Sequence, residues 1–339
     1  MGSFNEIMQQ ITGGLTGDRE HDAAYLMEQC EKYKSHDMAK EIIRACSRLM
    51  YSFISEEDRQ KMTQAIMNAT QGYESILEEA QFKVYQKKYA EALSLLDNLV
   101  HQVEEMGMYK DDQVSEYHCF TEFFEEVLYR EWENPQKELR QCDFPYALIY
   151  LRYGSLLFEM KRYDEAREAL AIAMKWNPAN AYIAFEHAET YKVKGEFEEF
   201  RQKTLEIFRY AFRPDHVARC YRNLGFYYVE KGEWLSALAC YERSLAFEPE
   251  AKEAMSELYY IREKSGMDFR HFSLEELERF DFPTGPDRDV LGLAFSYGKY
   301  FLDKQNTDGA RYCLQIVYGL THDDKVKAMI DNLTEEEQE

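Results

Sequence analysis

The feature that most constrains the fold of this 339-residue chain is a spacing of glycine, alanine and proline that occurs twice. In both segments twelve positions lead from the glycine to the alanine, and twelve more lead to the proline: Gly154, Ala166, Pro178 and Gly225, Ala237, Pro249. A unit that recurs with a period of about 34 residues buries its apolar face only by stacking on neighbouring copies. The spacing therefore predicts a one-dimensional array of repeats.

Each repeat is predicted to be a pair of helices. Between the glycine and proline marks, apolar residues follow the i, i+3, i+4, i+7 pattern of an amphipathic helix, and no segment shows the alternation of a strand. Proline ends a helix, whereas Gly195, Gly232 and Gly266 can supply the left-handed turn that follows one. The sequence therefore predicts an all-α fold.

Residues 218–251 resemble the tetratricopeptide repeat (TPR), whose pattern is W-x2-L-G-x2-Y, A-x3-F, A and P over about 34 positions. The matching residues are Tyr221, Leu224, Gly225, Tyr228, Ala237, Tyr241 and Pro249. Residues 147–180 match it as well, and weaker copies cover residues 20–53, 73–106, 181–217 and 291–324. In 181–217, Ala188 replaces the glycine and about three residues are inserted. The resemblance implies a right-handed superhelical solenoid of antiparallel helix hairpins, with degenerate repeats toward the N-terminus.

Breaks in the period divide the chain into parts. We expect a mobile lead-in at 1–19, a degenerate helical-hairpin region at 20–144, a TPR array at 145–268, an irregular connector at 269–290, a C-terminal hairpin with a capping helix at 291–333, and an acidic tail at 334–339. One long helix is expected from Asp112 to Trp132. Ser55 and Ser273, each followed by acidic residues, predict helix starts.

The charge balance narrows the class of partner. The chain carries 63 acidic and 41 basic residues, for a net charge of -22. This excess argues against a nucleic-acid partner and against an anionic membrane surface. It keeps a long helical array soluble, and a basic or apolar ligand is the second interpretation. No apolar run reaches the roughly 18 residues of a membrane-spanning helix, and the N-terminus lacks the pattern of a signal peptide.

Motifs for catalysis or metal binding are not found in the sequence. The seven cysteines are scattered without a CxxC pair, which fits reduced thiols in a cytoplasmic protein. The eight histidines belong to no metal motif, and His187 falls on a packing position of its repeat. Adjacent acids such as Glu125 and Glu126 are expected to be solvated. We therefore expect no enzymatic activity, no cofactor and no metal.

The resemblance also implies where a ligand would bind, because the first helix of each TPR hairpin lines a concave groove. The groove side chains come from positions 2, 5, 9, 12 and 13 of each repeat, sometimes joined by position 6. These positions place the following residues in a peptide- or protein-binding groove: Tyr182, Phe185, Glu189, Arg219, Arg222, Asn223, Phe226 and Tyr260. The same positions of residues 147–180 add Leu148, Leu151, Ser155, Phe158 and Glu159. Exposed aromatic side chains there would anchor a peptide.

Arg219 and Arg222 lie three residues apart in an otherwise acidic chain. Two guanidiniums beside the Asn223 amide suit a carboxylate or a peptide backbone. The arrangement is similar to the clamp with which some TPR proteins hold a C-terminal carboxylate, although Phe185 and Glu189 replace the lysine and asparagine of that clamp. In the alternative interpretation, the arginines hold neighbouring helices together by pairing with nearby carboxylates: Glu186, Glu189 or Glu230.

The leading hypothesis is a cytoplasmic, bacterial TPR adaptor that binds a peptide or protein segment in the groove of residues 147–262. A second hypothesis is a peptide-sensing regulator whose atypical N-terminal helices, residues 20–133, act on another protein. A third is a structural module that self-assembles through aromatic-rich convex faces. All three hypotheses stay open at this point.

Overall fold

A computed structural model describes residues 3–53, 72–106 and 109–336. The chain divides into two compact units: Met1–Cys119 with Pro135–Arg152, and Phe120–Asn134 with Tyr153–Glu339. The helix start expected at Ser55 lies outside the described residues, and so do residues 337–339 of the expected acidic tail.

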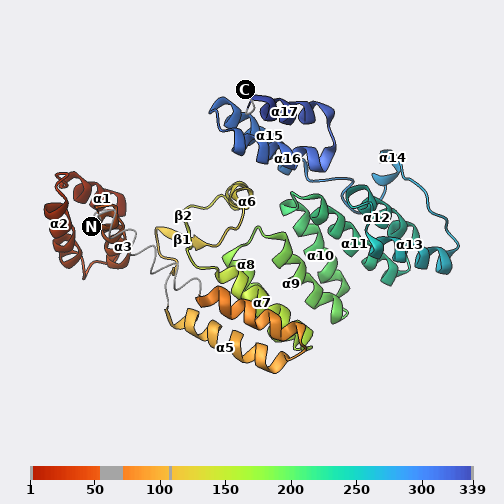
Figure 1. The fold of residues 1–339 in the computed structure, drawn as a ribbon, viewed down its shortest axis with the longest axis horizontal. Coiled ribbons are helices and arrows are strands. Elements are labelled where there is room, and N and C mark those ends of the chain that lie inside the picture. Colours follow the sequence, from red (N-terminus) through yellow and green to blue (C-terminus); the bar gives the residue numbers. More distant parts are fainter. Residues whose placement is uncertain (1–2, 54–71, 107–108, 337–339) are drawn as a thin grey trace. The chain divides into compact units, whose positions relative to one another are not determined.

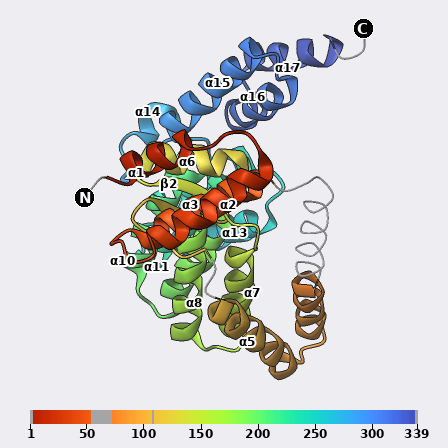
Figure 2. The ribbon, with the colours of Figure 1, turned by 90° about the vertical axis from the view of Figure 1, so that its left-hand side faces the viewer.

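Three helices at the N-terminus surround a small core of their own. They are α1 (Phe4–Gly13), α2 (Arg19–Lys32) and α3 (Ala39–Phe53), and they gather as one bundle in Figures 1 and 2. In place of the expected mobile lead-in, residues 4–13 form a helix with a capping box at Ser3. The helix is held because Ile7 and Ile11 of α1 are buried in one apolar cluster with residues of α2 and α3. Those partners are Leu26, Ile42 and Cys46.

The rest of the first unit combines helices with a small sheet. Residues 72–85 are helical and precede α5 (Tyr89–Met106). Two short parallel strands follow, β1 (Ser115–His118) and β2 (Glu138–Gln141), and Ser115 lies opposite Glu138. Helix α7 (Tyr146–Glu159) begins in the first unit and ends in the second.

The strands add a small sheet to an otherwise helical fold, and they correct one expectation, the long helix from Asp112 to Trp132. The Asp112 carboxylate accepts the backbone N–H groups of Val114 at 2.9 Å and Ser115 at 2.7 Å, which turns the chain before any helix can start. The chain then pairs as β1, and its helix, α6, covers only Phe123–Glu133. Strands of four residues are too short to show an alternating pattern, so the sequence did not reveal them.

The second unit is a series of helices, most of which pack on the next helix along the chain. These are α8 (Tyr163–Trp176), α9 (Ala181–Val193), α10 (Phe197–Ile207), the 3₁₀ helix η1 (Phe208–Tyr210), α11 (Pro214–Lys231), α12 (Trp234–Phe247), α13 (Lys252–Ser265), α14 (Leu274–Leu277), α15 (Arg288–Asp303), α16 (Thr307–Thr321) and α17 (Asp324–Glu336). Sequence neighbours contact each other from α8 to α13 and again from α15 to α17 (Figure 1). The expected helical, TPR-like solenoid of antiparallel hairpins is confirmed in this unit.

The same turn closes five hairpins. A backbone N–H donates to the carbonyl five residues earlier, at 2.9 to 3.0 Å: Lys88 to Lys83, Arg162 to Leu157, Glu196 to Tyr191, Glu233 to Tyr228 and Asn306 to Phe301. The residue before each donor has a positive φ: Lys87, Lys161, Gly195, Gly232 and Gln305. This combination is the Schellman closure of a helix. The turns fall at one position of the repeats that begin at 73, 147, 181, 218 and 291, which confirms the predicted register.

The repeat glycines let the two helices of a hairpin approach closely. A Cβ atom on Gly154 would lie 2.6 Å from Leu170, and one on Gly225 would lie 2.7 Å from the Tyr241 ring. Side chains never pack so closely, so a large residue of the second helix fills the space that glycine leaves. The recurring glycine is therefore a packing residue.

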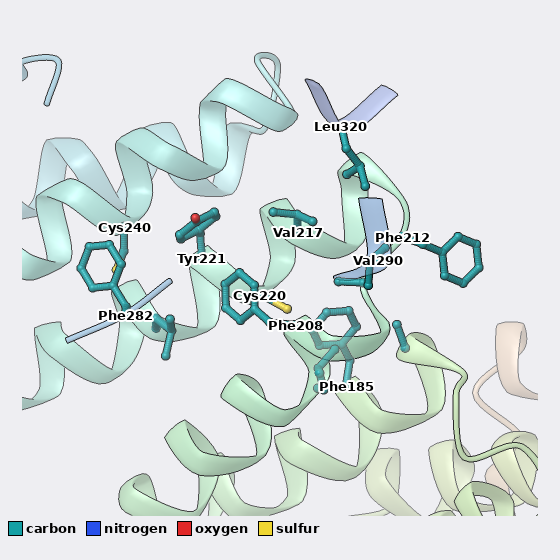
Figure 3. Close-up of a cluster of buried hydrophobic side chains, with 14 of the residues drawn as sticks. Phe185, Phe208, Phe212, Val217, Cys220, Tyr221, Cys240, Phe282, Val290 and Leu320 are labelled. Carbon is teal, nitrogen blue, oxygen red and sulfur yellow. The ribbon is translucent and has the colours of Figure 1, made fainter. Parts of the chain in front are cut away.

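One continuous apolar core runs through the second unit. Figure 3 shows its central part, where Phe185, Phe208 and Tyr221 lie near one another. The Phe208 and Tyr221 rings are 5.2 Å apart and meet edge to face. Phe208 belongs to η1, which forms where residues were inserted into the repeat 181–217. The insertion therefore adds aromatic side chains to the core.

Candidate functional site

The first unit contains a pocket of 570 Å³ between the helix of residues 72–85 and the start of α7. We call it the α7 groove, and its lining residues are Glu74, Leu77, Glu78, Gln81, Phe82, Tyr85, Leu148 and Arg152. Phe82 is 58% exposed, Tyr85 84% and Leu148 37%. Large apolar side chains that remain exposed around one concavity mark an interaction surface more strongly than scattered ones do.

The polar residues of the α7 groove give it a mixed chemistry. Glu74 and Glu78 lie one helical turn apart, so their carboxylates project from the same side of the helix. Across the groove, Arg152 Nη1 donates to Gln81 Oε1 at 3.3 Å. Such a groove can hold apolar side chains and place a cation beside two carboxylates.

Of these lining residues, only Leu148 was predicted from the sequence. Glu74, Leu77, Gln81 and Tyr85 occupy positions 2, 5, 9 and 13 of the repeat 73–106, so the positions that gave Leu148 identify them as well. The signal was therefore present in the sequence, but the weak repeat pattern before residue 110 concealed it.

In the second unit, Arg219 takes part in an ion pair between helices. Its Nη2 lies 3.0 Å from Glu186 Oε1 and 4.0 Å from Glu189 Oε1, and its guanidinium lies 4.6 Å from the centre of the Phe185 ring. These contacts join α11 to α9. The alternative interpretation, in which the arginine holds neighbouring helices together, therefore describes Arg219.

Arg222 also has a carboxylate partner, although not one of those expected. Its Nη1 lies 2.6 Å from Glu248 Oε2, at the end of α12. A ligand carboxylate would have to displace this ion pair and the one at Arg219. The two arginines consequently do not form an open carboxylate clamp.

Two of the predicted groove residues lie in the core instead. Phe185 has no exposed surface and Asn223 is only 5% exposed. Phe185 is covered by two side chains of α11. Arg219 lies over its ring, and the centre of the His216 ring lies 6.4 Å from the centre of the Phe185 ring. The Asn223 amide points to Thr204 Oγ1 at 3.5 Å, inside the hairpin stack. Neither side chain can contact a ligand in this arrangement.

The remaining predicted residues lie at the surface of the second unit. Tyr182 and Tyr260 are exposed, whereas Glu189 and Phe226 are half-buried. The Tyr182 hydroxyl donates to Asp215 Oδ2 at 2.5 Å, and Lys192 lies 4.5 Å from the centre of the Phe226 ring. In the repeat 147–180, Leu151 of the first unit and Ser155 and Phe158 of the second are half-buried, and Glu159 is exposed.

Two buried histidines of the second unit are shifted toward the neutral form. Burial lowers the pKa of His216 to about 4, among the rings of Tyr182 at 5.0 Å and Phe212 at 5.6 Å. Burial likewise lowers the pKa of His187 to about 4. Both are packing residues, as expected for His187, and neither is placed as a general base.

Glu125 was expected to be solvated, but the structure buries it. Its Oε2 accepts from Thr121 N at 2.7 Å and from Asn177 Nδ2 at 2.8 Å, while its Oε1 accepts from Asn180 Nδ2 at 2.7 Å. These bonds give both carboxyl oxygens of Glu125 a hydrogen-bond partner, although the residue is only 2% exposed. They also join the start of α6 to the turn between α8 and α9, which is a structural role.

Within residues 3–53, 72–106 and 109–336, no group of three or more histidine, cysteine or acidic side chains is placed to hold a metal. Among the helices that the structure describes, none is both long enough and apolar enough to span a bilayer.

No protein-family model and no curated protein matches the chain. Several solved TPR structures are similar to it. The first TPR of Spaghetti (RPAP3), bound to an HSP90 peptide, is 24% identical with a TM-score of 0.33, and the match covers 36% of this chain and 94% of that one. YrrB, a TPR protein with an unusual peptide-binding site, is 17% identical with a TM-score of 0.31, and the match covers 62% of this chain and 98% of that one. A tetratricopeptide repeat protein from Parabacteroides merdae is 11% identical with a TM-score of 0.40, and the match covers 97% of this chain and 98% of that one. The assignment of a TPR-like fold rests on the five equivalent turns.

Proposed function

We propose that the chain is a non-enzymatic, cytoplasmic scaffold of bacterial origin that binds a protein or peptide segment in the α7 groove. The observation that carries the proposal is the exposure of Phe82, Tyr85 and Leu148 around one concavity. Aromatic and aliphatic side chains that a ligand can desolvate supply most of the binding free energy at interfaces. Tyr85 and Leu148 also occupy first-helix positions, 13 and 2 of their repeats, that fit the ligand side of a TPR hairpin.

The charges of the groove favour a class of ligand. Among the described lining residues, Glu74 and Glu78 outnumber the one cation, Arg152, and the whole chain has a net charge of -22. A segment with one or two apolar side chains flanked by lysine or arginine therefore complements the groove in shape and charge. We expect its association rate to fall as salt is added, because long-range steering is screened.

A cross-linking experiment in the native organism tests the proposal. A benzophenone amino acid replaces Phe82 in the groove or, as a control, Tyr259, which is 57% exposed on α13 of the second unit. We expect a specific cross-linked protein from position 82, and we expect Leu148→Glu to abolish it. The proposal is wrong if position 82 gives no adduct, or gives the same adducts as position 259.

The regulator hypothesis has one observation in its favour, because α1 to α3 enclose a core of their own. The long helix from Asp112 to Trp132, its other support, does not exist. We therefore propose it as the second candidate only, with the N-terminal bundle as the effector. A two-hybrid or pull-down experiment with residues 3–53 substituted on their exposed face would test it, and unchanged partners would exclude it.

A further inference from the structure

The connector between α13 and α15 is longer than joining two helices requires. It contains 22 residues, from 266 to 287, of which only α14 is helical. Connections between packed helices are usually about 2 to 8 residues long, and much longer ones commonly have a function of their own. Residues 280–284 of this connector form a segment that we call the strap.

The strap is held by its main chain. Asp281 O accepts hydrogen bonds from Arg201 Nη2 at 2.9 Å and from the Tyr228 hydroxyl at 3.0 Å. Pro283 O accepts from the Tyr221 hydroxyl at 2.8 Å, and Thr284 O accepts from Arg243 Nη2 at 3.1 Å. The four donors come from α10, α11 and α12. Because the acceptors are backbone carbonyls, these donors would hold any peptide with the same path.

Three side chains of the strap supply selectivity, and the central one of its aromatic pocket is Phe282. Phe282 is 8% exposed, and its ring centre lies 5.9 Å from that of Tyr228 and 6.3 Å from that of Tyr221. Figure 3 shows it beside Tyr221 and Cys240. The Phe280 ring stacks on Phe282 at 5.2 Å and 9°. In addition, Arg201 Nη2 lies 2.5 Å from the Asp281 carboxylate. The site therefore accepts an aromatic–acidic–aromatic sequence.

We propose that α10, α11 and α12 form a second peptide-binding site, which the strap occupies in this structure and which an aromatic–Asp–aromatic–Pro peptide of another protein can occupy in its place. The site has what peptide recognition requires: donors that bind the main chain, an aromatic pocket that binds one side chain and an arginine that binds the carboxylate. It lies wholly in the second unit, so it does not depend on the α7 groove.

The strap competes with a free peptide for the site and therefore lowers the apparent affinity of that peptide. A tethered segment acts at an effective concentration of about a millimolar, so a free peptide at micromolar concentration occupies few wild-type molecules. Weakening the strap removes the competitor but leaves the four donors in place. Affinity for the free peptide should then rise.

The experiment measures binding of a fluorescent peptide with the sequence of residues 278–286 by polarisation. The full chain is used as wild type, as Phe282→Ala and as Phe269→Ala, a control that shortens an exposed aromatic side chain of the same connector. We expect Phe282→Ala to bind at least about tenfold more tightly than wild type and Phe269→Ala to match wild type. Adding Arg201→Ala and Arg243→Ala to Phe282→Ala should abolish binding.

Because Phe282 belongs to the core, Pro283→Gly is measured in parallel. It loosens the strap through the backbone without removing a buried ring. The proposal is refuted if the peptide binds neither variant while circular dichroism shows native helix content, or if a scrambled peptide binds equally well. It is also refuted if the arginine substitutions leave binding unchanged.

Discussion

Replacing His216 with phenylalanine should stabilise the second unit, and the gain should grow as the pH falls. His216 packs among aromatic rings, and neither of its ring nitrogens has a hydrogen-bond partner among the described residues. An aromatic ring without polar atoms fits the same space. At pH 7 it avoids burying unsatisfied nitrogens, which costs about 1 to 3 kcal/mol.

The pH dependence follows from the lowered pKa. Burial is the main cause, the charges of Arg213 and Arg219 act in the same direction, and Asp215 opposes them. The folded pKa is about 4, whereas an exposed histidine has a pKa of about 6.5. The unfolded chain therefore takes up a proton first, and stability is lost as the pH falls from about 6.5 to about 4. Between pH 7 and pH 5 this loss is about 2 kcal/mol.

Urea unfolding at pH 7 and pH 5 measures the difference. The three tryptophans, Trp132, Trp176 and Trp234, all lie in the second unit, so their fluorescence follows that unit alone. Wild type should lose about 2 kcal/mol more than His216→Phe between the two pH values. His187 should contribute a similar loss to both proteins, because its pKa is also lowered to about 4. Equal losses in wild type and variant would refute the assignment of a buried, neutral His216.

Three further substitutions test the packing, each by the same fluorescence-detected unfolding. Gly225→Ala should cost about 1 to 3 kcal/mol, because its Cβ would lie 2.7 Å from Tyr241; an unchanged free energy of unfolding would contradict the close approach. Lys161→Gly should stabilise the second unit by about 1 kcal/mol, since Lys161 has a φ of 61°; destabilisation would speak against the left-handed turn. Glu125→Gln should cost about 1 to 3 kcal/mol, because an amide turns an N–H toward donors such as Asn177 or Asn180, and a neutral result would exclude the buried carboxylate network.

The hairpins could be predicted from the sequence because their marks are local. Gly195 and Gly232 take the left-handed conformation that their residue type favours. At the equivalent turns, Lys87, Lys161 and Gln305 take the same conformation without a glycine. There the helices on both sides impose the turn, and no residue type in the sequence predicts it. The register therefore followed from the array as a whole.

The candidate site was harder to predict because it depends on contacts between distant segments. The positional rule placed Phe185 in a groove, but His216 and Arg219 cover it. The same rule identified Leu148, and residues 72–85 complete that groove. Nothing in the sequence marked the strap as a ligand-like segment, since its bonds join residues about 40 to 80 positions apart.

The central claim is that the α7 groove binds a peptide segment. Selection of a displayed peptide library on the wild-type chain tests it most directly, followed by affinity measurements on Leu148→Glu and Ile172→Glu. Leu148 and Ile172 are both 37% exposed on helices, but only Leu148 lines the groove. We predict that the selected peptides combine apolar and basic residues, and that binding is lost in Leu148→Glu and kept in Ile172→Glu. Peptides that bind all three proteins equally, or a selection that enriches none, would contradict the claim.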